Sequence, residues 1–177
     1  IRQITKTLLI ELEKQVGNKW YAHEEIENIS AASTMHDVGK ISVPDYILNK
    51  PGKLTAEEFE IMKEHTVNGC KILDSIDMIK CSPMYKYYYD ICRSHHERWD
   101  GRGYPDGLVG DMIPISAQIV SVADVYDALT SKRVYKPPYS HEKAVDMILN
   151  GECGKFNPDI IECLKNCHME LKDILDK

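Results

Sequence analysis

The sequence predicts a single domain that is built entirely from α-helices. Three observations support this: apolar residues recur at helical spacing along most of the chain, no alternating run is long enough to require a sheet, and no repeat or low-complexity linker divides the 177 residues. A chain of this length can bury a core of ordinary size, and 43% hydrophobic residues are typical of globular proteins. We therefore expect one all-α domain over residues 1–177.

The N-terminal part is predicted to hold two helices. Apolar and charged positions mix at helical spacing over residues 7–13, and Gly17-Asn18 is a stop signal. A second helix is expected from about residue 24 to residue 35, where apolar residues recur every three positions: Ile26, Ile29, Ala32 and Met35.

The remaining helices are marked by a cap and by further periodic segments. Thr55 and Glu58 form a capping-box pattern, which predicts a helix running towards His65. Further helices are expected over residues 84–96, 116–131, 140–150 and 158–173. Two loops lie between them: residues 44–54, with the turn signal Pro51-Gly52, and residues 99–110, with four glycines.

The charge balance limits the kinds of partner. The net charge is −6 and the isoelectric point is near 5.6, which argues against binding long nucleic acid through a broad basic surface. A small anionic ligand stays compatible with this balance, because metal ions and a few local cations can reverse the field inside a cleft.

The spacing of the cysteines favours free thiols in a reducing compartment, and the hydropathy of the chain indicates no membrane span. The six cysteines form no Cys-x-x-Cys pair, and the closest two, Cys163 and Cys167, would need two more well-spaced ligands to bind zinc. We expect buried or surface thiols instead. No apolar run approaches the roughly 20 residues that cross a bilayer, so no membrane contact is expected in this segment.

Three groups of polar residues at or inside apolar helices stand out as candidates for chemistry. They are His36-Asp37, His95-His96-Glu97, and Asp124 with Asp127. A lone histidine at a helix end is usually a cap or a surface residue. A carboxylate among Val122, Ala123 and Val125 is costly to bury without a cation, and three such groups together match the ligands of iron, manganese or zinc.

These groups fall inside longer motifs that resemble a known family. The segment His36-Asp37-Val38-Gly39-Lys40 is similar to the signature of HD phosphohydrolases, and residues 95–105, reading HHERWDGRGYP, resemble the defining motif of the HD-GYP phosphodiesterases. Residues 113–135 and the segment Gly154-Lys155-Phe156-Asn157-Pro158 continue the pattern, so the resemblance covers about residues 24–165. It implies an HD-domain helical bundle with a glycine-rich Gly-Tyr-Pro loop.

The resemblance also implies a metal centre and its ligands. Two or three divalent ions, iron or manganese by donor type, would be held by His36, Asp37, His65, His95, His96 and Asp124. Two such ions about 3.5–4 Å apart lower the pKa of a shared water, and Asp37 and Asp124 are able to bridge them. Lys40, Asp37 and Asp124 are therefore expected to serve catalysis.

Substrate contacts are implied at both ends of the motif series. Lys40, Arg133 and Lys136 resemble the cations that hold the substrate phosphates, and the alternative for the last two is a solvated helix end. Tyr104 is expected either to shape the substrate pocket or to pack inward as part of the loop. Asp127 is expected near the substrate or, like Glu97 and Asp100, as a residue that orients the ligands.

The expected activity is hydrolysis of cyclic di-GMP to the linear dinucleotide pGpG, and onward to GMP. The family also places a metal histidine in its first helix, but no histidine occurs between Ile1 and Trp20. By the resemblance its position falls immediately before Ile1, so either it belongs to a preceding part of the chain or the site lacks it. A nucleotide-binding regulatory module with weak catalysis is therefore one alternative. An HD phosphohydrolase that acts on another nucleotide, such as a mixed cyclic dinucleotide, is another.

The resemblance extends to the cellular setting. Because the first residue is Ile1, we expect an N-terminally truncated catalytic domain that is preceded by a sensory or receiver domain. Family members are bacterial signalling proteins of the cytoplasm, with GGDEF-type or regulatory domains as partners. Two other features are discounted: Tyr85, Tyr87, Tyr88 and Tyr89 are expected to form a packed helix face, and His23, His141 and His168 are expected on the surface.

Overall fold

The computed structural model describes residues 1–17, 23–132 and 137–175. Within these ranges the chain is helical and forms no strand, although Asp100 and Val109 make an isolated antiparallel bridge. The predicted all-α class is therefore confirmed. The α-helices are α1 (Arg2–Val16), α2 (His23–Ala32), α3 (Asp45–Leu48), α4 (Ala56–Asp74), α5 (Asp77–Lys80), α6 (Tyr85–Ser94), α7 (Ile115–Thr130), α8 (His141–Leu149) and α9 (Pro158–Leu175). Three short 3₁₀ turns complete the order: η1 (Ser33–Met35), η2 (Val38–Ser42) and η3 (Gly110–Met112).

Capping residues define three of the helix ends, two of them at the predicted stop signal and the predicted capping box. Helix α1 ends at Gly17, whose φ of 68° lies in the left-handed region that glycine adopts without strain. Helix α4 begins with the predicted capping box, in which the Thr55 side chain and the Glu58 side chain each accept from the other residue's backbone N–H. Ser140 caps α8 by accepting from the backbone N–H of Lys143.

The expected loop over residues 44–54 and the expected helix over residues 24–35 need correction. The loop begins with α3, a helix of four residues, and α2 tightens into η1 after Ala32. Elements of three or four residues complete only about one turn, so their apolar residues cannot show a repeat.

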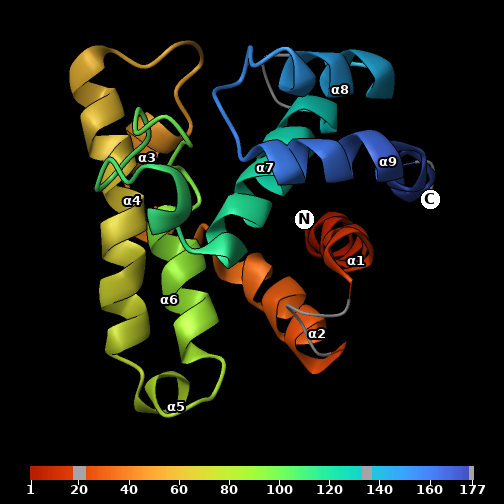
Figure 1. The fold of residues 1–177 in the computed structure, drawn as a ribbon. Coiled ribbons are helices and arrows are strands. Elements are labelled where there is room, and N and C mark those ends of the chain that lie inside the picture. The colour runs from red at the N-terminus through yellow and green to blue at the C-terminus, as the bar shows by residue number, and fades with distance from the viewer. Residues whose placement is uncertain (18–22, 133–136, 176–177) are drawn as a thin grey trace.

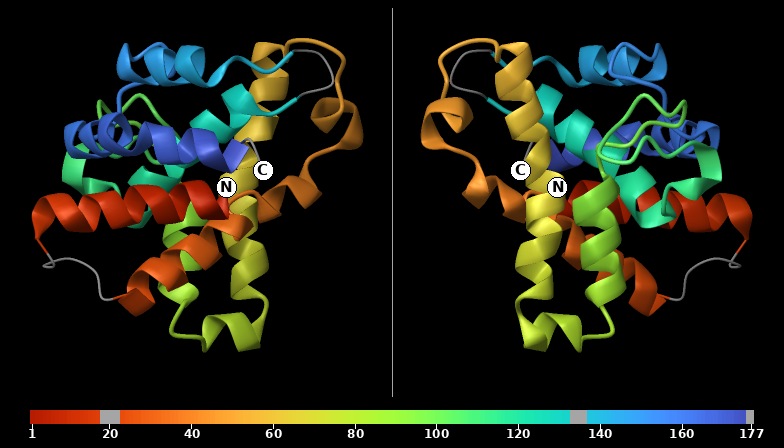
Figure 2. Two further views of the ribbon diagram at one scale, coloured as in Figure 1. Left: turned by 90° about the vertical axis from the view of Figure 1, so that its right-hand side faces the viewer. Right: turned by 90° about the vertical axis from the view of Figure 1, so that its left-hand side faces the viewer.

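Helix α7 lies between two groups of helices (Figures 1 and 2). On one side, α4 and α6 run side by side in opposite directions and are joined through α5. On the other side, α1, α8 and α9 pack against α7, and α2 packs against α1 and α6. Every residue of α7 from Ser116 to Ala123 is buried, which explains why apolar residues occur around the whole circumference of this helix.

The main core is built from apolar residues of both groups. It includes Leu8, Leu9, Ile29, Ile91, Ile119, Val122, Tyr126, Ile148, Ile160 and Leu164. Cys163 and Cys167 are buried in the same core, and all six cysteines are free thiols, as expected.

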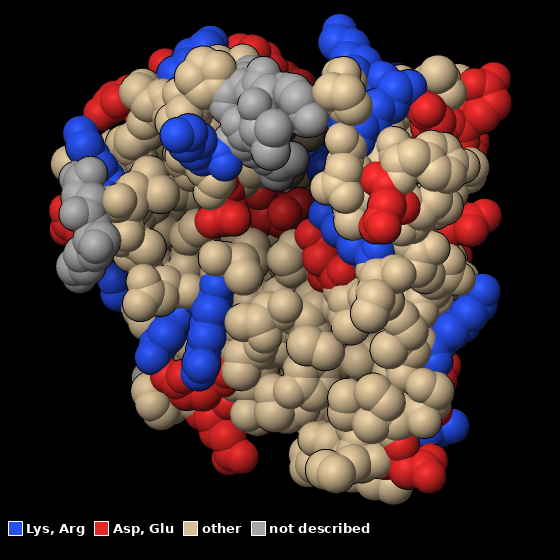
Figure 3. All heavy atoms as spheres, turned by 180° about the vertical axis from the view of Figure 1, so that it is seen from behind, with Lys and Arg blue, Asp and Glu red and all other residues tan. Residues whose placement is uncertain are grey.

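Charges of both signs are mixed over the face of the molecule that Figure 3 shows. On the face shown in Figure 3, Lys and Arg side chains are scattered among Asp and Glu rather than gathered in one broad patch, and acidic side chains lie recessed in a hollow. Within the described residues, no helix combines the length and the apolar character that crossing a membrane requires.

Candidate metal centre

Four separate segments bring the six predicted metal ligands together. His36 and Asp37 lie in the turn between η1 and η2, and His65 lies in the middle of α4. His95 caps the C-terminus of α6 and His96 follows it, while Asp124 comes from α7. One ligand atom from each of Asp37, His65, His95 and His96 falls within a group whose members are all within 4.8 Å of one another.

Asp37 is the centre of this cluster. Its Oδ1 lies 3.4 Å from Nε2 of His65 and 3.8 Å from Nε2 of His95, and its Oδ2 lies 3.3 Å from Nε2 of His36. The same Nε2 of His36 is 3.5 Å from Oδ1 of Asp124. Asp124 therefore joins the cluster through His36, and two carboxylates flank one imidazole.

Three of the histidines are oriented by a hydrogen bond of their second ring nitrogen. Nδ1 of His36 bonds the carbonyl of Ser33 at 2.7 Å, Nδ1 of His65 bonds that of Met62 at 2.7 Å, and Nδ1 of His95 bonds that of Ile91 at 2.9 Å. A carbonyl only accepts, so each Nδ1 carries a proton. Nε2 of His65 and Nε2 of His95 therefore keep their lone pairs towards Asp37, which is the usual arrangement of metal-bound histidines. Nε2 of His36 also faces Asp37, but it carries a proton that a metal would have to displace.

The cluster fits a divalent metal by its chemistry as well as by its geometry. Oδ1 of Asp37 is buried and is one of two buried side-chain oxygens in the described residues that have no hydrogen-bond partner. A buried carboxylate oxygen without a donor is costly, and a cation among the surrounding imidazoles would compensate it. Imidazole and carboxylate donors without thiolate suit iron, manganese or zinc.

Burial and mutual contact displace the pKa values of the cluster. For His36, burial opposes the charged form, but hydrogen bonds to Asp124 and Asp37 outweigh it and raise the pKa to about 9. Burial lowers the pKa of His65, His95 and His96, so these rings are neutral near pH 7 and ready to bind a cation. Burial opposes ionisation of Asp37 too, but its contacts with His36 and Lys40 hold its pKa below the usual range.

Two glycines let the His36-Asp37 turn approach α4. A Cβ atom on Gly39 would lie 1.9 Å from the backbone oxygen of His65 and 2.5 Å from the backbone nitrogen of Gly69. Real atoms do not approach so closely, so only glycine allows η2 to cross α4 at this distance. The crossing places Asp37 against His65.

Two of the predicted substrate-binding residues, Lys40 and Tyr104, contact the cluster directly, whereas Asp127 lies one helical turn away from it. Nζ of Lys40 is 2.5 Å from Oδ2 of Asp37, so the ammonium stands at the edge of the site. The ring of Tyr104 stacks on His96 at 4.7 Å and 30°, and it meets Phe59 edge to face at 6.0 Å. Asp127 lies one turn beyond Asp124 on α7.

Arg133 and Lys136 lie outside the described residues, and their predicted contacts with phosphate stay predictions. Beside the cluster, a cavity of about 250 Å³ is lined by Tyr104 and Pro105 of the glycine-rich loop and by a face of α4: Glu60, Lys63, Glu64 and Val67.

Glu97 has a different partner set from the one expected. It is 2% exposed, and its carboxylate accepts from the backbone N–H groups of Asp106, Gly107 and Leu108 at 2.7–3.1 Å. It therefore fixes the glycine-rich loop rather than a metal-binding imidazole. A bidentate pair between Arg93 and Asp106, at 2.8 and 2.7 Å, adds to this fixation, and no spacing in the sequence indicates it.

The expectation that His141 lies on the surface is wrong. His141 is 7% exposed, its Nδ1 is 2.7 Å from the Tyr126 hydroxyl and its Nε2 is 3.1 Å from Nδ1 of His168. It is buried because the first turn of α8 packs against α7 and α9. His23 is exposed, as expected, and His168 is half-buried.

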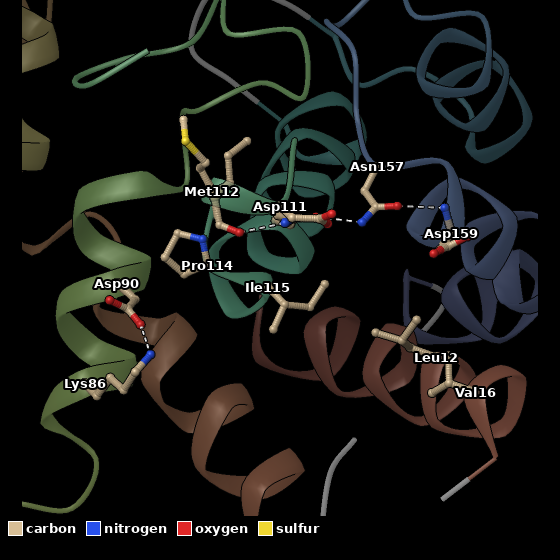
Figure 4. A pocket seen from close by; sticks show the side chains of 12 residues that line it. Leu12, Val16, Lys86, Asp90, Asp111, Met112, Pro114, Ile115, Asn157 and Asp159 are labelled. Carbon is tan, nitrogen blue, oxygen red and sulfur yellow. Dashed lines mark hydrogen bonds and ion pairs between the residues drawn. The ribbon is translucent and has the colours of Figure 1, made fainter. Parts of the chain in front are cut away.

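A larger cavity, of about 440 Å³, lies away from the cluster (Figure 4). Its apolar wall comes from Leu12, Val16, Met112, Pro114 and Ile115, and no predicted site residue lines it. At its back, Gln118 donates to the carbonyl of Ile113, Asn157 donates to Gln118, and the backbone N–H of Asp159 donates to Asn157. This network joins the first turns of α7 and α9.

Comparisons with known proteins agree with the fold and with the motifs. A family model described as HD domain matches residues 6–160. A cyclic di-GMP phosphodiesterase of Vibrio cholerae is 46% identical over 138 residues, which are 77% of this chain and 28% of that protein. A cyclic di-GMP phosphodiesterase of Thermotoga maritima is 44% identical over 149 residues, which are 84% of this chain and 39% of that protein.

Further relatives differ in the substrate that their names give. A 3′3′-cGAMP-specific phosphodiesterase 2 of Vibrio cholerae is 43% identical over 143 residues, which are 81% of this chain and 27% of that protein. The chain thus spans between 27% and 39% of the length of these three relatives.

A solved structure supports the fold. Bd1817, a HDG"Y"P protein from Bdellovibrio bacteriovorus, matches with a TM-score of 0.68 at 21% identity, over 99% of this chain and 52% of that one. The family match, the relatives and the signature at His36 and Asp37 agree with the resemblance seen in the sequence: the chain belongs to the HD domain family and carries the HD-GYP motif.

Proposed function

We propose that this chain is the catalytic domain of a metal-dependent phosphodiesterase that hydrolyses a cyclic dinucleotide, cyclic di-GMP first to the linear pGpG. The observation that carries the proposal is the cluster around Asp37, in which imidazole lone pairs and a buried, unpartnered carboxylate oxygen face one another. The names of relatives at 44–46% identity support the same substrate class.

The metal centre would be held by the four histidines and two aspartates of the cluster, with iron or manganese favoured by the donor set. Bound there, two or three divalent ions would supply an activated water and would offset charge on the phosphate. Asp37 and Asp124 would be the carboxylates able to bridge these ions, because both contact Nε2 of His36, Asp37 from the same turn and Asp124 from α7.

Other residues of the chain would bind and orient the substrate. Lys40 would turn from Asp37 to a phosphate oxygen once a cation shares that carboxylate. Tyr104 would form one wall of the substrate pocket, since its ring lies directly against His96. Arg133 and Lys136 would add contacts to the second phosphate, and Asp127 would orient groups at the far end of the cluster.

A mixed cyclic dinucleotide is the second candidate substrate. It is favoured by the name of one relative, which at 43% identity is nearly as similar as the cyclic di-GMP phosphodiesterases. The metal cluster would contact phosphate and water, which are the same for both nucleotides, so it does not distinguish cyclic di-GMP from a mixed cyclic dinucleotide. The choice would depend on contacts with the bases.

A turnover assay with both nucleotides tests the proposal. The chain, loaded with manganese or anaerobically with iron, is incubated with cyclic di-GMP or 3′3′-cGAMP, and the products are separated by ion-pair chromatography. We expect linear dinucleotide from at least one substrate. Asp37→Asn should lower the rate by at least about a hundredfold, because it removes a bridging carboxylate.

Asp77→Asn is the matched control, because Asp77 lies in the first turn of α5, away from the cluster. It should leave the rate unchanged. An unchanged substrate peak with fully metal-loaded wild-type chain would contradict the proposal. Tight nucleotide binding in that same sample would instead support a regulatory binding module.

A further inference from the structure

The segment Gly154-Lys155-Phe156 has no part in the metal cluster, although its sequence belongs to the motif series. It packs against the turn that follows His95 and His96 at the end of α6. The backbone N–H of Trp99 donates to the carbonyl of Lys155 at 2.9 Å. The guanidinium carbon of Arg98 lies over the ring of Phe156 at 5.0 Å, within the range of a cation–π contact.

Arg98 connects this segment to both sides of the metal cluster. Its Nη1 donates to the carbonyl of Glu97 at 2.9 Å and reaches that of His95 at 3.4 Å. The same nitrogen donates to Oγ of Ser121 at 2.7 Å. Ser121 lies on α7, three residues before Asp124. One guanidinium therefore links the turn that carries His95 and His96 to the helix that carries Asp124.

Gly154 makes room for the Arg98 side chain. Its φ of 110° is one that L side chains rarely adopt, and a Cβ atom there would lie 2.7 Å from Nε and 2.8 Å from Cδ of Arg98. The Phe156 ring covers the guanidinium from another side. Gly154 and Phe156 thus form a socket around the Arg98 side chain. Within this socket the guanidinium faces Ser121.

We propose that Arg98 is a positioning residue of the metal centre: it fixes the distance between the His95-His96 turn and Asp124, and the Gly154–Phe156 socket fixes Arg98. This inference rests on the proposed metal-dependent function. The arrangement resembles the groups behind metal ligands, whose loss weakens metal binding although they never touch the ion. It also gives the Gly-x-Phe element a role that its sequence does not reveal.

Cobalt binding separates a positioning role from a purely structural one. The metal-free chain is titrated with Co²⁺, and its visible absorption reports both the affinity and the ligand geometry. We expect Arg98→Ala to raise the Kd for Co²⁺ about 10–100-fold and to change the shape of the visible spectrum. Arg98→Lys keeps the charge but not the planar fork, so it should recover only part of the affinity.

Arg102→Ala is the matched control, because this arginine lies in the same loop with a side chain that is 88% exposed. It should bind Co²⁺ like the wild type. Thermal unfolding of each metal-free variant is followed in parallel. If Arg98→Ala fails to fold, Ser121→Ala tests the proposal instead. This variant removes only one hydrogen-bond acceptor of Arg98, and it should still weaken Co²⁺ binding severalfold.

The outcomes also distinguish this proposal from the one on which it rests. Wild-type affinity and spectrum in both Arg98→Ala and Ser121→Ala would overturn the positioning role and leave the metal centre intact. Absence of Co²⁺ binding by the wild-type chain would overturn the metal-dependent function and the positioning role together.

Discussion

The surroundings of Asp37 favour both the ionised form of its carboxylate and the binding of a cation to it. Its carboxylate is half-buried, its Oδ2 contacts His36 and Lys40, and its Oδ1 faces two imidazole lone pairs without a donor. Removing a charge from water is expensive unless a partner compensates it. In the metal-free chain the compensation comes from the protonated His36. A bound cation would replace that proton.

Proton release on metal binding follows from these pKa values. At pH 7, His36 is charged because its pKa is raised to about 9, while His65, His95 and His96 are neutral because burial lowers theirs. A histidine must lose its proton to bind a metal. The imidazoles should therefore release about one proton per chain at pH 7, and this release should disappear as the pH rises through about 9.

Calorimetric titrations in buffers of different ionisation enthalpy measure the protons released. His36→Gln is the control, since it should lower the release at pH 7 by about one proton. Equal release by the wild type and by His36→Gln, or equal release below and above the His36 pKa, would contradict this assignment.

The sequence could predict which six histidines and aspartates cluster, but not the residues that hold them in place. Five of the six stand in the motif series that carries the family resemblance, whereas His65 is isolated in the sequence and is expected at the site only from that resemblance. The contacts of Arg98 with Ser121 and Gly154 join residues that are far apart in the chain, and both partners are ordinary in composition. Such pairs become visible only once the helices are packed.

At the scale of whole elements, the metal centre depends on where helices stop. Neighbouring residues of a regular helix point about 100° apart, so His95 and His96 could not both face one point inside α6. The helix ends at Ser94, and the two rings lie with centroids 4.0 Å apart. Long helices with caps were predictable, but α3, α5 and the 3₁₀ turns that place His36 and Asp37 are too short to show a period.

The crossing of η2 and α4 predicts the effect of a small substitution. Gly39→Ala would place a methyl carbon 1.9 Å from the His65 backbone oxygen, so η2 must move away from α4. We expect a loss of about 1–3 kcal/mol in the free energy of unfolding, as for other overpacked sites, together with weaker metal binding. Chemical denaturation and metal analysis measure the two effects.

Gly52→Ala is the control for that substitution, because nothing lies within 4 Å of a Cβ atom there, although its φ of 137° adds some strain of its own. It should keep full metal content. Wild-type stability and metal binding in Gly39→Ala would show that η2 and α4 are not held at this distance.

Substitution of Glu97 should affect the order of the glycine-rich loop rather than the residues of the metal cluster. Glu97→Gln removes the charge that accepts from three backbone N–H groups and puts an amide donor in its place. Hydrogen bonds to charged groups contribute about 1.5–3 kcal/mol each, so we expect faster hydrogen exchange at Asp106, Gly107 and Leu108.

The exposed Glu64 gives the control for the loop. Glu64→Gln should leave exchange at these three amides unchanged. If Glu97→Gln also leaves their protection unchanged, the carboxylate does not hold the loop in solution.

Over the whole molecule, the ligands tie together segments that are distant in the sequence. His36, between η1 and η2, and Asp124, on α7, stand 88 positions apart. An ion bound between them binds the folded chain and not the unfolded one, so it should stabilise the entire domain. The overall class and the single core were predictable, but the burial of His141 was not, because it depends on how α8 packs on two distant helices.

Metal removal should therefore lower the thermal stability. At a free metal concentration of about a hundred times the Kd, the gain is about 2.7 kcal/mol, and for a domain of this size each kcal/mol shifts Tm by about 2–4 °C. We expect Tm to fall by about 5–10 °C on chelation. Differential scanning calorimetry with and without a chelator checks this, and Asp37→Asn should show a much smaller difference.

The stacked rings of His96 and Tyr104 should allow metal binding to be followed by spectroscopy. A phenol held 4.7 Å from an imidazole has a fixed, asymmetric electronic environment, and an ion taken up by that imidazole would alter it. Near-ultraviolet circular dichroism should therefore change as the centre fills, and Tyr104→Phe should reduce that change. The protein would in this way carry its own optical reporter of occupancy, without any added label.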